Sequence, residues 1–70
     1  MEIIFTAHAE FRIKKRKLLK EEVINAIRFP DKVLKKHEKY YYQKKLNRGM
    51  IEVVTEKTES NINVITIYWL

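Results

Sequence analysis

The C-terminal half of the chain alternates between apolar and polar residues with the period of two that is typical of β-strands. Three such runs cover residues 40–46, 50–56 and 62–69. A tight connection around Gly49, the only glycine, separates the first two runs, and a polar loop at 57–61 separates the last two. Consecutive strands are therefore expected to pair antiparallel. Val33 and Leu34 are candidates for an additional short edge strand.

The N-terminal half has apolar residues at helical spacing. Residues 2–6 predict a short strand, and Thr6 is the natural N-cap of a helix from residue 7 to about residue 17. Pro30 disfavours helix at the residue before it. A second helix is predicted by acidic residues in a first turn and apolar residues at helical spacing, namely Glu21, Glu22, Val23, Ile24, Ala26 and Ile27. Lys20 stands where a stronger capping residue is expected, so the start of this helix is poorly marked.

These elements predict an α+β fold in the order β-α-α-β-β-β, with two helices packed on one antiparallel sheet. Residues 1–70 form a single domain. A chain of this length buries only about 60% of its unfolded surface. A partner protein or a homodimer interface is therefore expected to add stability.

Three basic residues fall at i, i+4 and i+8 of the first predicted helix, namely His8, Arg12 and Arg16. They share one face and span about 80° of arc. The helix dipole and Arg12 both oppose an imidazolium at His8. We therefore expect a neutral imidazole that can accept a proton, beside two permanent cations that can hold a phosphate. Apolar positions border this stripe on both sides and suggest a groove: Ala7, Phe11 and Leu18 on one side, Ala9 and Ile13 on the other.

The net charge of +6 is unevenly distributed. Residues 12–48 hold 14 of the 15 Lys and Arg and only four acidic residues, a net charge of +10, and the rest of the chain carries −4. The positive electrostatic potential produced by this concentration of charge favours a polyanion or an acidic protein as partner. A surface rich in lysine and glutamate is also typical of proteins from hot environments, and composition alone does not separate the two interpretations.

Metal-independent RNA cleavage is chemically possible with these residues. The 2′-hydroxyl of RNA is the nucleophile, so the protein has to remove its proton, hold the charge on the phosphorane and protonate the leaving oxygen. We assign the first task to His8 and the second to Arg12 and Arg16 as candidate catalytic residues. The candidates for RNA binding are Lys15, Tyr40, Tyr42, Lys44 and Lys45. Because consecutive strand residues point to opposite faces, either Tyr41 or the pair Tyr40 and Tyr42 is expected to serve the core.

Other chemistries have little support in the sequence. The two histidines have no cysteine or carboxylate cluster at ligand spacing, so no metal site is expected. A lone glycine does not form a phosphate-binding loop, and the only serine, Ser60, has no base near it in sequence. No cofactor is expected. The absence of cysteine, of a long apolar run and of a basic leader indicates a cytoplasmic protein without membrane contact.

Two stretches of the sequence carry a resemblance to a known family. The first is His8-Ala9-x-x-Arg12-x-x-x-Arg16 followed by Leu18, Glu21-Glu22-Val23 and Ala26-Ile27, and the second is Val64-Ile65-Thr66-Ile67-Tyr68. Together they resemble domain-of-unknown-function family 4258 over almost the whole chain. The resemblance implies a relation to BrnT and RelE toxins, which set two helices beside an antiparallel sheet and include ribonucleases paired with antitoxins. Lys20 departs from the small or acidic cap that members often carry.

The resulting hypothesis is a toxin-like, metal-independent ribonuclease that acts on RNA and is neutralised by an acidic antitoxin. The alternative is a non-catalytic module that holds nucleic acid or an acidic protein on the same stripe. In that case Arg12 and Arg16 position phosphates or carboxylates, and His8 packs at the helix start. A third possibility is a structural stripe that pairs with Glu52 or Glu56 across the contact between helix and sheet.

Overall fold

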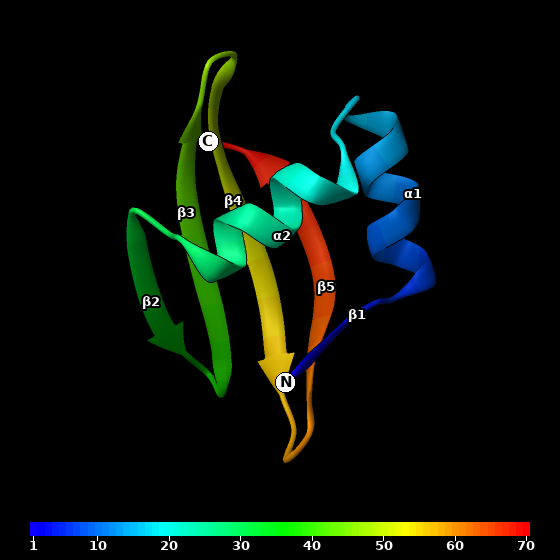
Figure 1. Ribbon diagram of the computed structural model, residues 1–70, viewed down its shortest axis with the longest axis vertical. Coiled ribbons are helices and arrows are strands. Elements are labelled where there is room, and N and C mark those ends of the chain that lie inside the picture. Colours follow the sequence, from blue (N-terminus) through cyan, green and yellow to red (C-terminus); the bar gives the residue numbers. More distant parts are fainter.

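The computed structural model describes residues 1–70 as two helices on one five-stranded sheet (Figure 1). The elements in chain order are β1 (Glu2–Phe5), α1 (Ala7–Lys15), α2 (Lys20–Arg28), β2 (Lys32–Lys36), β3 (Lys39–Leu46), β4 (Gly49–Lys57) and β5 (Asn61–Trp69). The predicted α+β class and the two-helix arrangement are confirmed. The candidate edge strand at Val33 and Leu34 is present as β2, which makes the order β-α-α-β-β-β-β.

The sheet has the strand order β1-β5-β4-β3-β2 and is mixed, not wholly antiparallel as predicted. Strands β2 to β5 pair antiparallel through short connections. β1 instead pairs parallel with β5, with Ile3 opposite Ile62 and Phe5 opposite Val64. No hairpin joins these two strands, so no tight turn sets their relative direction. The alternating pattern therefore predicted the hairpins correctly but not the orientation of β1.

Both helices contribute to one core on one face of the sheet. α2 crosses in front of the central strands, and α1 stands beside β5 (Figure 1). β1 pairs only with residues 61–64 of β5, and α1 lies beside the remainder of that strand. The core is formed by Ala9, Ile13, Leu18, Val23, Ala26, Ile27, Tyr42, Ile51, Val53, Ile62, Val64 and Ile67. The opposite face, which we call the helix-free face, carries the alternate residues of each strand.

Backbone geometry explains how the helices and the β3–β4 hairpin end. Lys17, in the turn after α1, has a φ of 57°, and Gly49, at the start of β4, has a φ of 140°. A Cβ at Gly49 would lie 3.3 Å from the Trp69 ring, so both conformation and space favour glycine there.

α2 begins at Lys20 with Leu19 as N-cap. Leu19 has no side-chain oxygen to cap the helix. Its backbone amide instead donates a hydrogen bond to the Glu22 carboxylate at 3.0 Å. Neither helix is long and apolar enough to cross a membrane.

Candidate functional site

Thr6 fixes the start of α1 against β5. Its hydroxyl oxygen accepts a hydrogen bond from the Ala9 amide at 3.1 Å and donates one to the Val64 carbonyl at 2.9 Å. The predicted N-cap is thereby confirmed. One side chain both caps the helix and ties it to the sheet, so the first turn, which contains His8, has a defined position.

His8 and Arg12 lie together on the surface of α1. Arg12 Nε donates to His8 Nε2 at 3.5 Å, the long end of the hydrogen-bond range. This bond requires an imidazole without a hydrogen on Nε2. His8 is exposed and Arg12 is half-buried. Neither residue takes part in the three ion pairs of the structure. The pair is therefore free to meet an external anion.

Arg16 belongs to the same stripe but also has a structural contact. Its Nε donates to the Ile67 carbonyl of β5 at 3.0 Å, and the indole of Trp69 donates to the Arg16 carbonyl at 3.4 Å. The first bond uses one of five guanidinium N–H groups. Arg16 therefore attaches the end of α1 to the sheet edge and keeps donors for a ligand.

The structure contains no ion pair between the stripe and the sheet. Glu52 is bonded to Gln43 and Tyr68 instead. Glu56 is exposed and forms no ion pair. The third possibility, a stripe that is neutralised by these two carboxylates, is thus not what the fold adopts.

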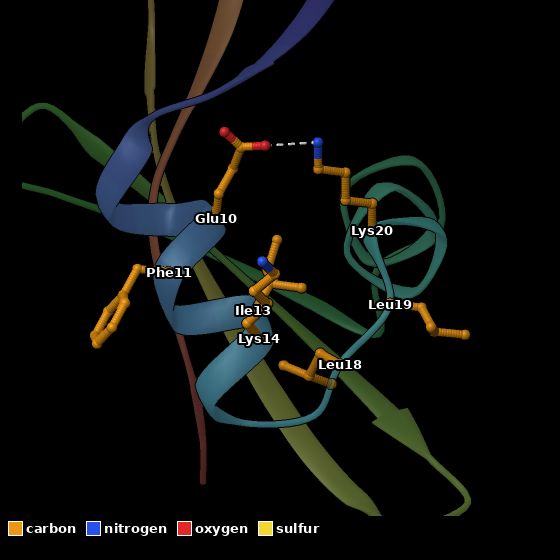
Figure 2. Close-up of a pocket in the computed structure, with 7 residues that line it drawn as sticks. All are labelled: Glu10, Phe11, Ile13, Lys14, Leu18, Leu19 and Lys20. Carbon is orange, nitrogen blue, oxygen red and sulfur yellow. Dashed lines mark ion pairs between the residues drawn. The ribbon is translucent and has the colours of Figure 1, made fainter.

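Only one of the two apolar walls expected beside the stripe is on the surface, the one that contains Ala7 and Phe11. Ala9 and Ile13 point into the core, whereas Ala7 is exposed and Phe11 is 56% exposed. The concave surface lies on the other flank of α1, between α1 and α2 (Figure 2). It has a volume of about 570 Å³ and is lined by Glu10, Phe11, Ile13, Lys14, Leu18, Leu19 and Lys20. None of the three stripe residues lines it.

An ion pair crosses the top of this pocket. Lys20 Nζ lies 2.8 Å from Glu10 Oε1, which links the two helices (Figure 2). The hydrogen bond and the charge of Lys20 lower the pKa of Glu10. Lys15, predicted to bind RNA, lies nearby with its ammonium 5.7 Å from the centre of the exposed Phe11 ring. Phe11 therefore lies between the pocket and the stripe, and the cationic groups of Arg12 and Lys15 lie near its ring.

The predicted RNA-binding residues of β3 do not share one face. Tyr40, Tyr42 and Lys44 point to the helix-covered face, whereas Lys45 points to the helix-free face. Tyr42 is buried in the core at 6% exposure and stacks on Tyr40 with ring centres 6.4 Å apart. Its ring therefore offers little surface to a base. Lys44 Nζ donates to the Phe29 carbonyl at 2.8 Å. Tyr41 is the tyrosine of this run on the helix-free face.

A polar cluster on the helix-free face was missed by the sequence reasoning. Gln43, Glu52 and Tyr68 lie directly opposite one another on β3, β4 and β5. Gln43 Nε2 donates to Glu52 Oε2 at 2.7 Å, and the Tyr68 hydroxyl donates to Oε1. The pKa of Tyr68 is raised to about 12, chiefly by its hydrogen bond to Glu52 and secondly by burial. Strict alternation along residues 62–69 groups Tyr68 with Ile62 and Val64, but a register shift between β4 and β5 at Val54 and Thr55 places Tyr68 on the opposite face. Neither this shift nor the register that joins Glu52 to Tyr68 is visible in the sequence.

No three His, Cys, Asp or Glu side chains come together as metal ligands. The fold and the stripe define a small α+β protein with a basic helix at the edge of its sheet. The chain belongs to the family described as "Domain of unknown function (DUF4258)", whose model matches residues 5–69. Comparisons with curated proteins and with solved structures give no match.

Proposed function

We propose that this protein is a metal-independent ribonuclease whose site is the stripe of His8, Arg12 and Arg16. The observation that carries the proposal is the exposed contact between His8 and Arg12, which no carboxylate neutralises. A neutral imidazole next to a guanidinium is a proton acceptor next to a phosphate site. The net charge of +10 on residues 12–48 attracts RNA to the same region.

The reaction starts when a contact between Arg12 and an RNA phosphate replaces the hydrogen bond between Arg12 and His8. An RNA phosphate draws Arg12 away from His8 and so frees the Nε2 lone pair. Nε2 then takes the proton of the 2′-hydroxyl, and O2′ forms a bond to phosphorus. The bond from phosphorus to O5′ breaks, and O5′ takes a proton from water. The hydroxide left behind takes the proton from the His8 imidazolium, which returns the imidazole to its neutral form. Arg12 and the free N–H groups of Arg16 hold the charge on the phosphorane, and the product is a 2′,3′-cyclic phosphate.

The toxin role and the acidic antitoxin belong to the same proposal. They follow from the resemblance to BrnT and RelE toxins, and the charge of the stripe supports them. Cytoplasmic RNA is the substrate that such a role implies. An acidic antitoxin would occupy the positions that Arg12 and Arg16 offer to phosphates.

The test is incubation of the purified protein with RNA in the presence of a chelator. We expect cleavage that leaves cyclic phosphate ends, and no cleavage of the same sequence with 2′-O-methyl groups. His8→Ala should lower the rate by about 100-fold or more, the usual contribution of a general base. His37→Asn is the matched control. His37 is the other histidine, is exposed and has a φ of 50°, which asparagine tolerates. Absence of cleavage for free and ribosome-bound RNA alike would refute the proposal.

A non-catalytic binding module is the second candidate, and one observation favours it. The lone pair of His8 Nε2, which a general base needs, already accepts a hydrogen bond from Arg12 Nε, whereas Arg12 and Arg16 both keep further N–H groups for an anion. If the wild-type protein binds RNA without turnover and His8→Ala binds equally well, this second function is the correct one.

A further inference from the structure

The helix-free face has a clear division of charge. On β2 and β3 it presents four lysines and no acidic residue, namely Lys32, Lys36, Lys39 and Lys45. None of these lysines forms an ion pair. Glu52 is the only carboxylate at the centre of this face; it is 7% exposed, and each of its oxygens is bonded. The β2–β3 side of the face therefore presents positive charge, and the central carboxylate is hidden, whereas the exposed Glu56 lies on the same face near the end of β4.

Two aromatic rings lie on the same face, on strands that are separated by β4. Tyr41 lies opposite Val54, and Tyr68 lies opposite Glu52 in the next row of the sheet. Both tyrosines are half-buried. Standard strand spacings place their Cα atoms about 12 Å apart. The hydrogen bond to Glu52 holds the Tyr68 ring in place, and the Lys36 ammonium lies 5.5 Å from the centre of the Tyr41 ring.

Rings interspersed with unpaired cations are the composition of surfaces that bind single-stranded nucleic acid. Bases stack on the rings, and the cations contact the backbone phosphates. A duplex hides the faces of its bases and offers only phosphates to such a surface. The rings therefore select unpaired strands, and the lysines add affinity without sequence preference.

The stripe of His8, Arg12 and Arg16 lies next to the β5 side of the helix-free face. Tyr68 is on β5, the strand beside which α1 stands. On α1, Glu10 faces α2 through its ion pair with Lys20. His8 and Arg12 are about 160° or more around the helix axis from Glu10. They therefore lie on the flank turned away from α2, where a strand that crosses from β2 to β5 arrives.

We propose that the helix-free face binds single-stranded RNA, with two bases stacked on Tyr41 and Tyr68 and phosphates held by Lys32, Lys36 and Lys45. This inference rests on the proposed function for the identity of the ligand, and it adds the strand state of the substrate and the surface that holds it. Binding at this face is independent of cleavage at His8.

The experiment measures binding without turnover. The probe is a fluorescein-labelled 2′-O-methyl oligouridylate of about 12 nucleotides, a length that suits single-strand binding sites, and the readout is fluorescence anisotropy. Because this probe has no 2′-hydroxyl, a failure of the ribonuclease proposal does not affect the result. We expect Tyr41→Ala to weaken binding about tenfold or more and Tyr41→Phe to leave it near wild type. The same strand in a duplex should bind at least tenfold more weakly.

Two adjacent lysines provide a matched control. Lys36 lies over Tyr41 on the helix-free face, and Lys35 lies over Tyr40 on the opposite face at a similar distance, 5.4 Å. Lys36→Gln should weaken binding and lower the slope of log affinity against log salt by about 0.7. Lys35→Gln removes the same charge and should change affinity less than twofold. Thermal unfolding of each variant checks that the fold is retained.

Three results would overturn the inference. Equal losses for Lys35→Gln and Lys36→Gln would show that only net charge matters. Equal affinity for duplex and single strand would show that the rings play no part. Sedimentation that finds a homodimer, which dissociates on Lys36→Gln or Tyr41→Ala, would show that a second copy covers this face. If Tyr41→Ala does not fold, the lysine pair and the duplex comparison decide the matter.

Discussion

Glu52 shows how a carboxylate can be held inside a protein without a cation. It is 7% exposed, and its two oxygens accept hydrogen bonds from Gln43 and Tyr68. Burial of an unpaired charge is costly unless donors replace the lost water. Since both donors come from neighbouring strands, the same contacts that satisfy Glu52 also fix the register of β3, β4 and β5.

Tyr68→Phe is expected to destabilise the protein by about 1–3 kcal/mol, because it leaves one oxygen of Glu52 without its donor. The ring and its packing are kept, so the loss reports on the hydrogen bond. Urea unfolding at neutral pH measures it. Tyr41→Phe removes a hydroxyl for which the structure shows no hydrogen bond and is the control. Equal stabilities of the two variants would contradict this role for Tyr68.

The same bond predicts a dependence of stability on alkaline pH. It favours the protonated phenol and raises the pKa of Tyr68 from its ordinary value of 10.0 to about 12. The stabilisation is complete below pH 10 and is lost as the pH rises from 10 towards 12. Ultraviolet titration should show one tyrosine that ionises late, and this component should be absent in Tyr68→Phe. A late component that persists unchanged in Tyr68→Phe would refute it.

At the scale of elements, the position of α1 depends on contacts at both of its ends. Thr6 anchors its start to Val64, and Arg16 anchors its end to Ile67. Thr6→Ala should cost about 1 kcal/mol through loss of the cap, with a further loss from the bond to β5. It should also lower the rate of the proposed RNA cleavage, since His8 is in the first turn. Urea unfolding and cleavage assays measure the two effects, and Thr6→Ser, which keeps the hydroxyl, should retain both. A stable but inactive Thr6→Ser would contradict the argument.

α2 is held by a contact between its first turn and the β3–β4 hairpin. Both oxygens of Glu22 accept bonds from Arg48 at 2.7 Å, and Arg48 also donates to the Lys17 carbonyl at 2.9 Å. The hydrogen bond from Arg48 lowers the pKa of Glu22 below its ordinary 4.5. The stabilisation is therefore present above pH 4.5 and is lost as the pH falls below it.

Glu22→Gln should cost about 0.5–1 kcal/mol at neutral pH and flatten the acid side of the stability profile. Urea unfolding between pH 3 and 7 provides the measurement. Glu10→Gln removes the carboxylate of the exposed pair with Lys20 and should have the smaller effect. A wild-type profile that is as flat as that of Glu22→Gln would show that the contact contributes nothing.

Local signals predicted the elements well, and non-local pairing accounts for what was not predicted. Thr6 and the spacing after it are sufficient for α1, because a helix and its cap are determined within a few residues. The start of α2 was less clear, since Leu19 is not a capping residue and Glu22 supplies the bond instead. Alternation could not say which face of β3 the helices cover. It therefore left open the choice between Tyr41 and the pair Tyr40 and Tyr42.

The same limit applies to the candidate site. The helical spacing of His8 and Arg12 was sufficient to bring them together, and the structure shows the contact. The bond from Arg16 to Ile67 spans 51 positions of the sequence, and the cluster around Glu52 depends on the register of three strands. Neither has a signature in the sequence.

At the scale of the whole molecule, the charge asymmetry predicts fast, salt-sensitive association with the proposed acidic antitoxin. Steering by charge raises association rates by about 10- to 1000-fold, and much of this is screened at physiological salt, where the Debye length is about 8 Å. Stopped-flow measurements at low and high salt should show this fall. Arg12→Ala should lower the rate at low salt more than Arg28→Ala, which removes an exposed charge at the far end of α2. A rate indifferent to salt and to Arg12 would place the interface elsewhere.

The parallel pairing of β1 with β5 has a consequence for synthesis of the chain. Residues 2–5 pair with residues 61–64, and the two anchors of α1 reach Val64 and Ile67. Chains fold from the N-terminus as the ribosome releases them, and contacts between distant residues form late. α1 is made before β5, the strand on which it docks, so it has no strand to dock on until β5 has emerged. A chain that lacks β5 therefore holds His8 on an undocked helix, and the topology lets the proposed site form only after β5 has been made.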